Sequence, residues 1–329
     1  MRRSRLRQTL VLGRACGEYV VGSAQFGFDY GLANRAGKPS PDAVRAMLAA
    51  AAAAGATTID TAAAYGDSES VLGGVLADDT DLSRRFWIIT KLAPEVEDAR
   101  DQGVVASLVR AAVDASRQRL RQDRIPLLLL HRSTARLALG GALWEALRGL
   151  VKEGAIGGLG ISVYTPEEAL DALSDPQVAA MQVPLSALDR RMVAAGVLDR
   201  CRERDVAVFA RSVFLQGALA APNLPIGAYP ERLRPYVDRF HREAARSGRS
   251  RASLALAYVR SIPGVAGFVI GAETIEQVRD NVALFEMEPL GADERNALEA
   301  ALGSPDDDLV DISRWKMPPP TGTQAILRP

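Results

Sequence analysis

The stretch Ile125–His131 reads Ile-Pro-Leu-Leu-Leu-Leu-His, an unbroken apolar run that ends on a polar side chain. Two earlier runs share this design: Thr57–Ala62 carries Asp60 near its end, and Phe86–Lys91 ends on a lysine. Apolar runs without polar alternation are typical of strands covered on both faces, as in a parallel sheet. We therefore predict three consecutive buried strands whose polar residues meet at one end of the sheet.

The same alternation of short apolar runs and helical patterns continues along the chain. Ser40-Pro41 and Thr165-Pro166 each place a capping residue before a proline, and Thr274 begins a capping box. Eight strands alternating with helices predict an α/β fold, a (β/α)8 TIM barrel. A doubly wound sheet is the alternative, but no G-x-G-x-x-G follows the first strand. The predicted strands are Tyr19–Phe26, Thr57–Ala62, Phe86–Lys91, Ile125–His131, Gly157–Ser162, Ala179–Leu185, Ala207–Phe214 and Ala266–Gly271.

Three segments fall outside this repeat. Leu6–Leu12 precedes the first strand and predicts a short N-terminal hairpin at the bottom of the barrel. Pro222–Ser247 predicts an insertion after strand seven that contains one extra helix. The proline-rich tail, residues 306–329, is expected to be flexible or to fold over the barrel mouth. No linker divides the chain, so we expect one domain over residues 1–329.

Composition narrows the class of protein. The 329 residues are 48% hydrophobic, and 40 basic residues balance 40 acidic ones. This balance gives no indication of a nucleic-acid or membrane partner. Cys16 and Cys201 lack metal-ligand spacing, and the apolar run near the N-terminus is too short for a signal peptide. We expect a cytoplasmic protein without a metal; the sequence leaves its oligomeric state open.

Acid–base residues gather at the predicted strand ends. Asp60, Lys91 and His131 end strands two, three and four, and Tyr65 lies in the loop after strand two. The carboxyl ends of the strands build the active site of such barrels. A nearby ammonium lowers the pKa of a phenol, a carboxylate holds that ammonium, and a neutral imidazole can orient a carbonyl group. The set predicts proton transfer to a polarised C=O group.

From about Val21 to Leu284 the sequence resembles the aldo-keto reductase family. Asp60–Gly66 matches the family motif D-T-A-x-x-Y-G, Thr90-Lys91 matches its T-K, and His131 matches its strand-four histidine. The resemblance implies a nicotinamide-dependent oxidoreductase. It implies Tyr65 as general acid, Lys91 as the residue that lowers its pKa, Asp60 as the lysine's partner and His131 as the carbonyl-orienting residue.

The resemblance also implies a cofactor site. Its nicotinamide end would use Ser162 and Gln182, with Leu185 at the position where the family stacks a tyrosine. The position after Ser162, usually asparagine, is Val163. The positions where the family often places basic residues for a 2′-phosphate read Gly271, Glu273 and Gln277, which could favour NAD. Because relatives with glutamine at this position also use NADP, NADP is expected, with NAD as the alternative. The pyrophosphate and adenosine ends would use Ser212, Leu215, Gly217, Gly271, Glu273, Gln277 and Asn281.

The substrate is the least defined part. Aromatic residues after strand one and the arginine after His131 predict a pocket formed by Phe26, Phe28, Tyr30 and Arg132, suited to a sugar-like or other small carbonyl or alcohol substrate. Arg132 and Arg190-Arg191 would also suit an acidic substrate. Trp315 and Met317 are expected to close over the pocket.

Two other functions remain open from the sequence. A nucleotide-binding regulatory protein on the same fold would act through partners with little turnover, and an unrelated barrel lyase would use Lys91 as a Schiff-base amine. In the favoured interpretation, the same residues reduce an aldehyde or ketone or oxidise an alcohol.

Overall fold

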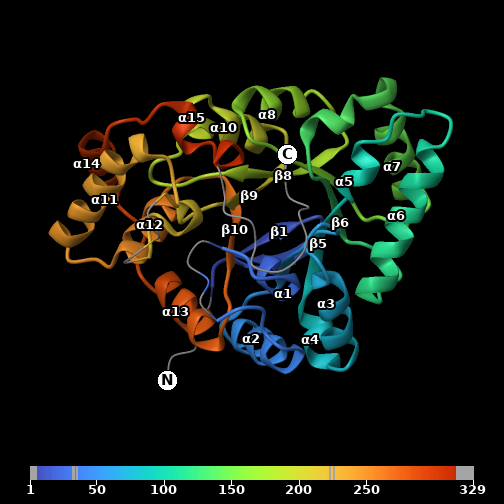
Figure 1. Cartoon of the computed structure of the whole chain (residues 1–329), viewed down its shortest axis with the longest axis horizontal. Coiled ribbons are helices and arrows are strands. Elements are labelled where there is room, and N and C mark those ends of the chain that lie inside the picture. Colours follow the sequence, from blue (N-terminus) through green and yellow to red (C-terminus); the bar gives the residue numbers. More distant parts are fainter. Residues whose placement is uncertain (1–5, 32–33, 35, 222–223, 225–226, 316–329) are drawn as a thin grey trace.

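The computed structural model describes residues 6–31, 34, 36–221, 224 and 227–315. Within them, eight parallel strands close into a barrel in the order β3 to β10, with β10 pairing with β3 (Figure 1). This confirms the predicted (β/α)8 barrel. The strands are β3 (Tyr19–Gly22), β4 (Thr58–Asp60), β5 (Trp87–Lys91), β6 (Leu127–Leu130), β7 (Leu159–Ser162), β8 (Val178–Pro184), β9 (Ala207–Arg211) and β10 (Val265–Gly271).

Strand register places the polar residues at one edge of the barrel. Gly22 pairs with Asp60, the last residue of β4, and Ser162 pairs with Gln182 across β7 and β8. Lys91, the last residue of β5, pairs with Leu129 of β6. Because all eight strands run parallel, these side chains reach the same mouth.

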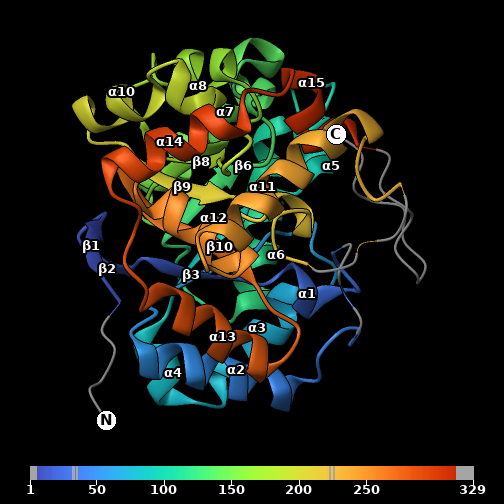
Figure 2. The same ribbon diagram turned by 90° about the vertical axis from the view of Figure 1, so that its left-hand side faces the viewer.

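Helices surround the strands on all sides, as Figures 1 and 2 show. The first long helix, α2, begins as predicted at Ser40, whose hydroxyl accepts from the Ala43 amide, and ends at Gly55 in the left-handed conformation. The helices are α1 (Ala24–Gly27), α2 (Pro41–Ala54), α3 (Ser68–Ala77), α4 (Thr80–Arg85), α5 (Pro94–Glu97), α6 (Val105–Leu120), α7 (Ala142–Lys152), α8 (Pro166–Ala172), α9 (Arg191–Ala194), α10 (Val197–Glu203), α11 (Arg234–Arg246), α12 (Arg251–Arg260), α13 (Ile275–Phe285), α14 (Ala292–Leu302) and α15 (Asp307–Val310).

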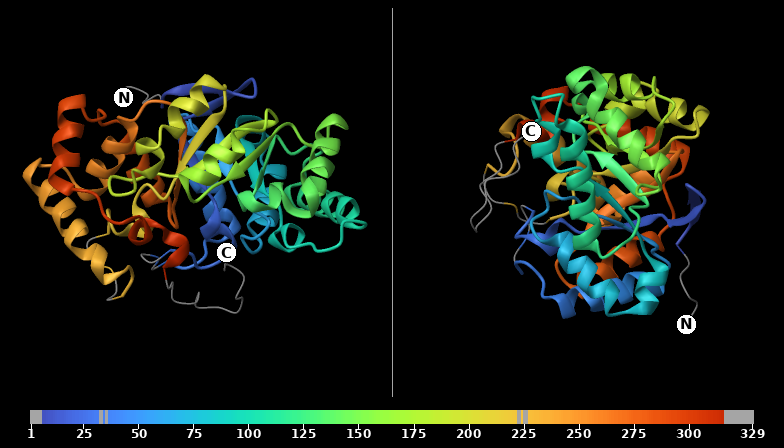
Figure 3. Two further views of the ribbon diagram at one scale, coloured as in Figure 1. Left: turned by 90° about the horizontal axis from the view of Figure 1, so that it is seen from above. Right: turned by 90° about the vertical axis from the view of Figure 1, so that its right-hand side faces the viewer.

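An N-terminal hairpin covers the far end of the barrel. It consists of β1 (Gln8–Val11) and β2 (Arg14–Gly17), which pair antiparallel. The backbone oxygen of Ala15 accepts from Trp87 Nε1 at 2.8 Å, and Val11 and Cys16 join the apolar cluster inside the barrel. The left view of Figure 3 shows the hairpin at one end of the barrel and the described C-terminal segment at the other. The predicted hairpin is confirmed, with its second strand extending past Leu12.

Several predicted strands are longer than the observed ones, and two of them include a segment with a different backbone shape. Tyr19–Phe26 stops being a strand at Gly22, and Ala24–Gly27 forms the short helix α1. Ala207–Phe214 stops at Arg211, because Ser212 has a φ of +58°, which a strand cannot contain. In both cases the apolar pattern continues into a buried segment of different backbone shape.

The insertion after β9 contains α11, which confirms the extra helix. The rest of the C-terminal segment contains α15 and ends, within the described residues, at the buried Trp315; Met317 lies outside them. Within the described residues, no helix has both the length and the apolar character needed to span a membrane.

Candidate active site

Lys91 is the centre of the candidate site. Its Nζ lies 2.9 and 2.8 Å from the two carboxylate oxygens of Asp60. The same ammonium donates to the backbone oxygen of Thr61 at 3.0 Å and to the Tyr65 hydroxyl at 3.3 Å. Two neighbouring strands and the loop after β4 thus bring three predicted residues into one hydrogen-bonded cluster.

The Lys91–Asp60 pair is buried. Lys91 is 1% exposed and Asp60 is 3% exposed. Burial lowers the pKa of Lys91, and the negative charge of Asp60 opposes that change. Since an ammonium has three N–H donors, the acceptors around Nζ satisfy all of them. The arrangement suits a fixed cation and leaves no lone pair aimed at a substrate.

Tyr65 is protonated at neutral pH. Burial raises its pKa well above the ordinary value, and the charge of Asp60 raises it further. The predicted lowering of this pKa is therefore not the net result in the structure. Lys91 still faces the phenol oxygen, so it can stabilise the negative charge that develops there when the proton leaves. The phenol is ready to act as a proton donor.

His131 follows β6 and lies edge-on to Tyr65, with the ring centroids 6.2 Å apart. Burial and the positive charge of Lys91 lower the pKa of His131 to about 3. Its Nδ1 is buried and has no hydrogen-bond partner among the described residues. The imidazole is thus neutral and can exchange hydrogen bonds without carrying charge.

Glu97, which sequence reasoning missed, fixes the segment that carries His131. Its carboxylate accepts from the His131 backbone amide and, at 3.0 Å, from the Arg132 backbone amide. Burial raises the pKa of Glu97 to about 7. Arg132 also pairs with Asp98 at 2.9 Å. The contact joins two loops far apart in sequence, so no local pattern could have indicated it.

The predicted substrate residues divide into two groups. Phe28 and Tyr30 are partly exposed beside Tyr65; the Phe28 ring centroid lies 6.5 Å from that of Tyr65. Phe26 is fully buried in the main core, so its predicted place in the pocket is wrong; α1 turns its side chain inward. Trp315 packs against Tyr229 instead.

At the predicted nicotinamide end of the cofactor site, the residues that the sequence indicated are almost fully buried. Ser162 and Gln182 are 3% and 1% exposed, and the Gln182 amide donates to Asp60 Oδ1 at 2.7 Å. Leu185 is fully buried in the main core. We therefore correct the prediction for Leu185: its side chain offers no surface on which a ring could stack.

The loop after β9 has an unusual backbone. Ser212, Leu215 and Gln216 all have positive φ values between 47° and 58°, a conformation that non-glycine residues rarely adopt. Such strain is typical of functional segments held in place by their surroundings. Leu215 itself is buried, so any contact it makes with a ligand would come from its backbone.

The N-terminus of α13 forms the other half of the predicted nucleotide site. Thr274 caps this helix by accepting from the Gln277 amide, and the Gln277 side chain accepts from the Glu273 amide at 2.7 Å. Asn281 donates to the backbone oxygen of Gly271 at 3.4 Å. A helix N-terminus suits a phosphate group. The strained loop and this helix end together fit an elongated, anionic nucleotide.

Arg211 and Tyr164 supply accessible surface next to Leu185. Arg211 ends β9, and its backbone oxygen accepts from the Leu185 amide. Its guanidinium carbon lies 4.3 Å from the Tyr164 ring centroid, and Nη2 donates to the backbone oxygen of Val163 at 3.0 Å. Sequence reasoning missed both residues: Tyr164 lies in the loop after β7, and Arg211 lies inside the predicted strand Ala207–Phe214, where the apolar pattern hid the end of the strand.

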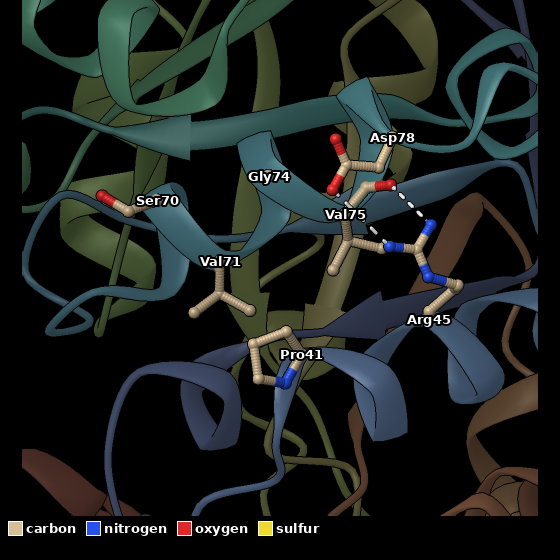
Figure 4. A pocket seen from close by; sticks show the side chains of 7 residues that line it. All are labelled: Pro41, Arg45, Ser70, Val71, Gly74, Val75 and Asp78. Atoms are coloured by element: carbon tan, nitrogen blue, oxygen red, sulfur yellow. Dashed lines mark hydrogen bonds and ion pairs between the residues drawn. The ribbon is translucent and has the colours of Figure 1, made fainter.

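Figure 4 shows a separate pocket of about 280 Å³ between α2 and α3. Pro41 and Arg45 line it from α2, and Val71 and Val75 from α3. Arg45 is tied there to the backbone oxygen of Val75 and to Asp78. The pocket belongs to the helix layer outside the barrel and contains none of the residues at the strand ends.

Comparison with known proteins assigns the chain to one family. Residues 20–302 match the family model described as the Aldo/keto reductase family. An aldo-keto reductase from Bacillus halodurans, in its holo form, superposes with a TM-score of 0.75 at 24% identity, over 92% of this chain and 98% of that one.

Curated relatives are oxidoreductases. A 6-dehydroglucose reductase of Agrobacterium fabrum is 27% identical over 251 residues, which cover 73% of this chain and 81% of that protein. The uncharacterised oxidoreductase YqkF of Bacillus subtilis is 26% identical over 264 residues, covering 75% and 83%. With a buried Asp60–Lys91 pair reaching Tyr65 at the mouth of an eight-stranded barrel, and with this match over most of its length, the chain belongs to the aldo-keto reductase family of oxidoreductases.

Proposed function

We propose that this protein reduces an aldehyde or ketone to an alcohol with a nicotinamide cofactor, with Tyr65 as the general acid. The observation that carries the proposal is the hydrogen bond from Lys91 to the Tyr65 hydroxyl, together with the ion pair between Lys91 and the buried Asp60 carboxylate. The four acceptor atoms around Lys91 Nζ, which belong to Asp60, Thr61 and Tyr65, favour its ammonium form, and this supports proton transfer over Schiff-base chemistry.

The residues have separate tasks in the proposed reaction. When bound, a nicotinamide cofactor would supply the hydride that the carbonyl carbon takes up. Tyr65 donates its proton to the carbonyl oxygen, so that the C=O bond becomes a C–H and an O–H bond. Lys91 stabilises the phenolate left behind, and neutral His131 donates a hydrogen bond to the same carbonyl oxygen. In alcohol oxidation the same groups act in reverse.

For the cofactor we propose NADP, with NAD as the alternative. The residues fit an elongated dinucleotide: the strained loop with Ser212 and Gly217 would hold the pyrophosphate, and Gly271 and the start of α13 the adenosine end. Ser162 and Gln182 lie at the strand ends where the carboxamide would bind.

The similarity to the 6-dehydroglucose reductase of Agrobacterium fabrum supports a sugar-like substrate. Such a substrate is a carbonyl compound with several hydroxyl groups. The partly exposed Phe28 and Tyr30, next to Tyr65, offer a ring face and a hydroxyl to it. We propose a small polar aldehyde as the substrate class.

The direct test is calorimetric titration with NADPH and with NADH, followed by assays of aldehyde reduction at 340 nm. We expect micromolar binding of NADPH, weaker binding of NADH, and reduction of glyceraldehyde. Binding without turnover of any aldehyde would favour the regulatory alternative. Failure to bind either nucleotide would reject the proposal.

The pH dependence of the reaction should come from Glu97 and not from His131. With a pKa of about 3, His131 stays neutral above pH 5, whereas Glu97, with a pKa of about 7, loses its proton as the pH rises through 7. The ionised carboxylate is the stronger acceptor for the His131 and Arg132 amides. We expect kcat/KM to rise between pH 6 and 8.

Profiles of kcat/KM from pH 5.5 to 9 for the wild type and Glu97→Gln test this assignment. The inflection near pH 7 should disappear in Glu97→Gln and persist in the control Glu95→Gln, which changes an exposed residue two positions earlier. An inflection that survives in Glu97→Gln would show that another group titrates.

A further inference from the structure

Several arginines lie near the mouth of the barrel, and most of them are neutralised. Arg132 pairs with Glu97 and Asp98. Arg191 forms two hydrogen bonds of 2.9 Å with the buried carboxylate of Asp189. These pairs give the arginines a structural task and weaken them as binding sites for an acidic ligand.

Arg211 is different. Among the described residues, no carboxylate lies within ion-pair distance of its guanidinium. The group donates to the backbone oxygen of Val163 at 3.0 Å and to the Ser212 hydroxyl at 3.5 Å. A guanidinium has five N–H donors, so three of them have no acceptor within the described part of the chain.

The guanidinium is held in place at the mouth of the barrel. Stacking on the Tyr164 ring and the bond to Val163 fix it across the ends of β7 and β9. Arg211 is the last residue of β9, as Asp60 and Lys91 are the last residues of β4 and β5, so the three lie at the same end of the barrel. Its positive charge contributes to lowering the pKa values of Tyr65, Lys91 and His131. A partly buried cation with free donors beside a reaction centre is a preorganised site for an anion.

We propose that Arg211 binds an acidic group of the substrate, and that the natural substrate is an aldehyde or ketone carrying a carboxylate or a similar anion. This inference rests on the proposed reductase function. The acidic group is not changed in the reaction; it positions the carbonyl for the proton from Tyr65. A phosphate group of the cofactor is also an anion that Arg211 could bind, so the test must distinguish an acidic substrate from the cofactor.

The experiment compares 4-carboxybenzaldehyde with its methyl ester, which lacks the negative charge and carries one additional methyl group. We expect the wild type to prefer the acid, and Arg211→Met to lower kcat/KM for the acid by about 10- to 100-fold, the loss expected for one charge-assisted contact. The value for the ester should fall much less than the value for the acid, so that the preference for the acid is lost. Arg211→Lys, which keeps the charge, should recover part of the preference, and Arg84→Met, on the exposed end of α4, should change neither value.

The NADPH affinity of Arg211→Met distinguishes a substrate anion from a cofactor phosphate, and benzoate binding distinguishes the anion site from the reductase function. An equal loss with acid and ester, or a parallel loss of NADPH affinity in Arg211→Met, would overturn the inference and assign Arg211 to structure or to the cofactor. Calorimetric titration with benzoate needs no turnover. If the wild type binds benzoate, Arg211→Met does not, and no aldehyde is reduced, the anion site stands and only the reductase function is rejected. If the wild type shows neither a preference for the acid nor benzoate binding, the anion site is rejected.

Discussion

Tyr65→Phe is expected to lower kcat/KM for aldehyde reduction by about 100- to 10,000-fold, the usual contribution of a general acid. The phenol is the proton donor nearest to the proposed carbonyl site, and Lys91 reaches it at 3.3 Å. Phenylalanine keeps the ring that packs against Phe28 and His131 and removes only the hydroxyl. Steady-state rates and calorimetric NADPH titration should show lost turnover with unchanged nucleotide affinity.

A matched control is Tyr229→Phe, which makes the same chemical change at a tyrosine that packs against Trp315. It should leave both kcat and nucleotide affinity as in the wild type. If Tyr65→Phe instead lost NADPH binding in proportion to activity, the hydroxyl would be a cofactor contact and another group would have to donate the proton.

The barrel and the residues that meet at its mouth could be predicted because local sequence determines them. Buried parallel strands are nearly pure apolar runs, so the polar residue that ends each run, such as Asp60 or Lys91, is visible without an alignment. Parallel pairing then brings these ends together whatever the loops do. The hairpin and the helix after β9 were predictable for similar reasons.

Contacts between distant loops could not be predicted in this way. Glu97 reaches the His131 amide across 34 positions, and Arg211 reaches the Val163 oxygen across 48. The direction of a side chain after a strand also depends on the backbone turn, which is why α1 buries Phe26 in the core. The pKa of Tyr65 is raised and not lowered, because burial has the largest effect on it. The sequence shows the neighbouring lysine but not this burial.

Lys91→Met separates the electrostatic task of the lysine from its structural one. The change keeps the length of the side chain but leaves the Asp60 carboxylate, which is 3% exposed, without its cation. Removing one partner of a buried ion pair typically destabilises a protein by about 3–5 kcal/mol. We expect a loss of this size in the free energy of unfolding, measured by urea denaturation, and turnover at or below that of Tyr65→Phe.

The double variant Asp60→Asn, Lys91→Met decides between the two causes. A neutral amide next to methionine removes the unpaired charge and can still accept from Gln182, which donates to Asp60 Oδ1 in the wild type. Most of the lost stability should therefore return. Activity should not, because no cation faces the phenolate that forms when Tyr65 gives up its proton. A double variant that regained both stability and turnover would show that Lys91 only neutralises Asp60, and the proton-transfer role assigned to the pair would fall.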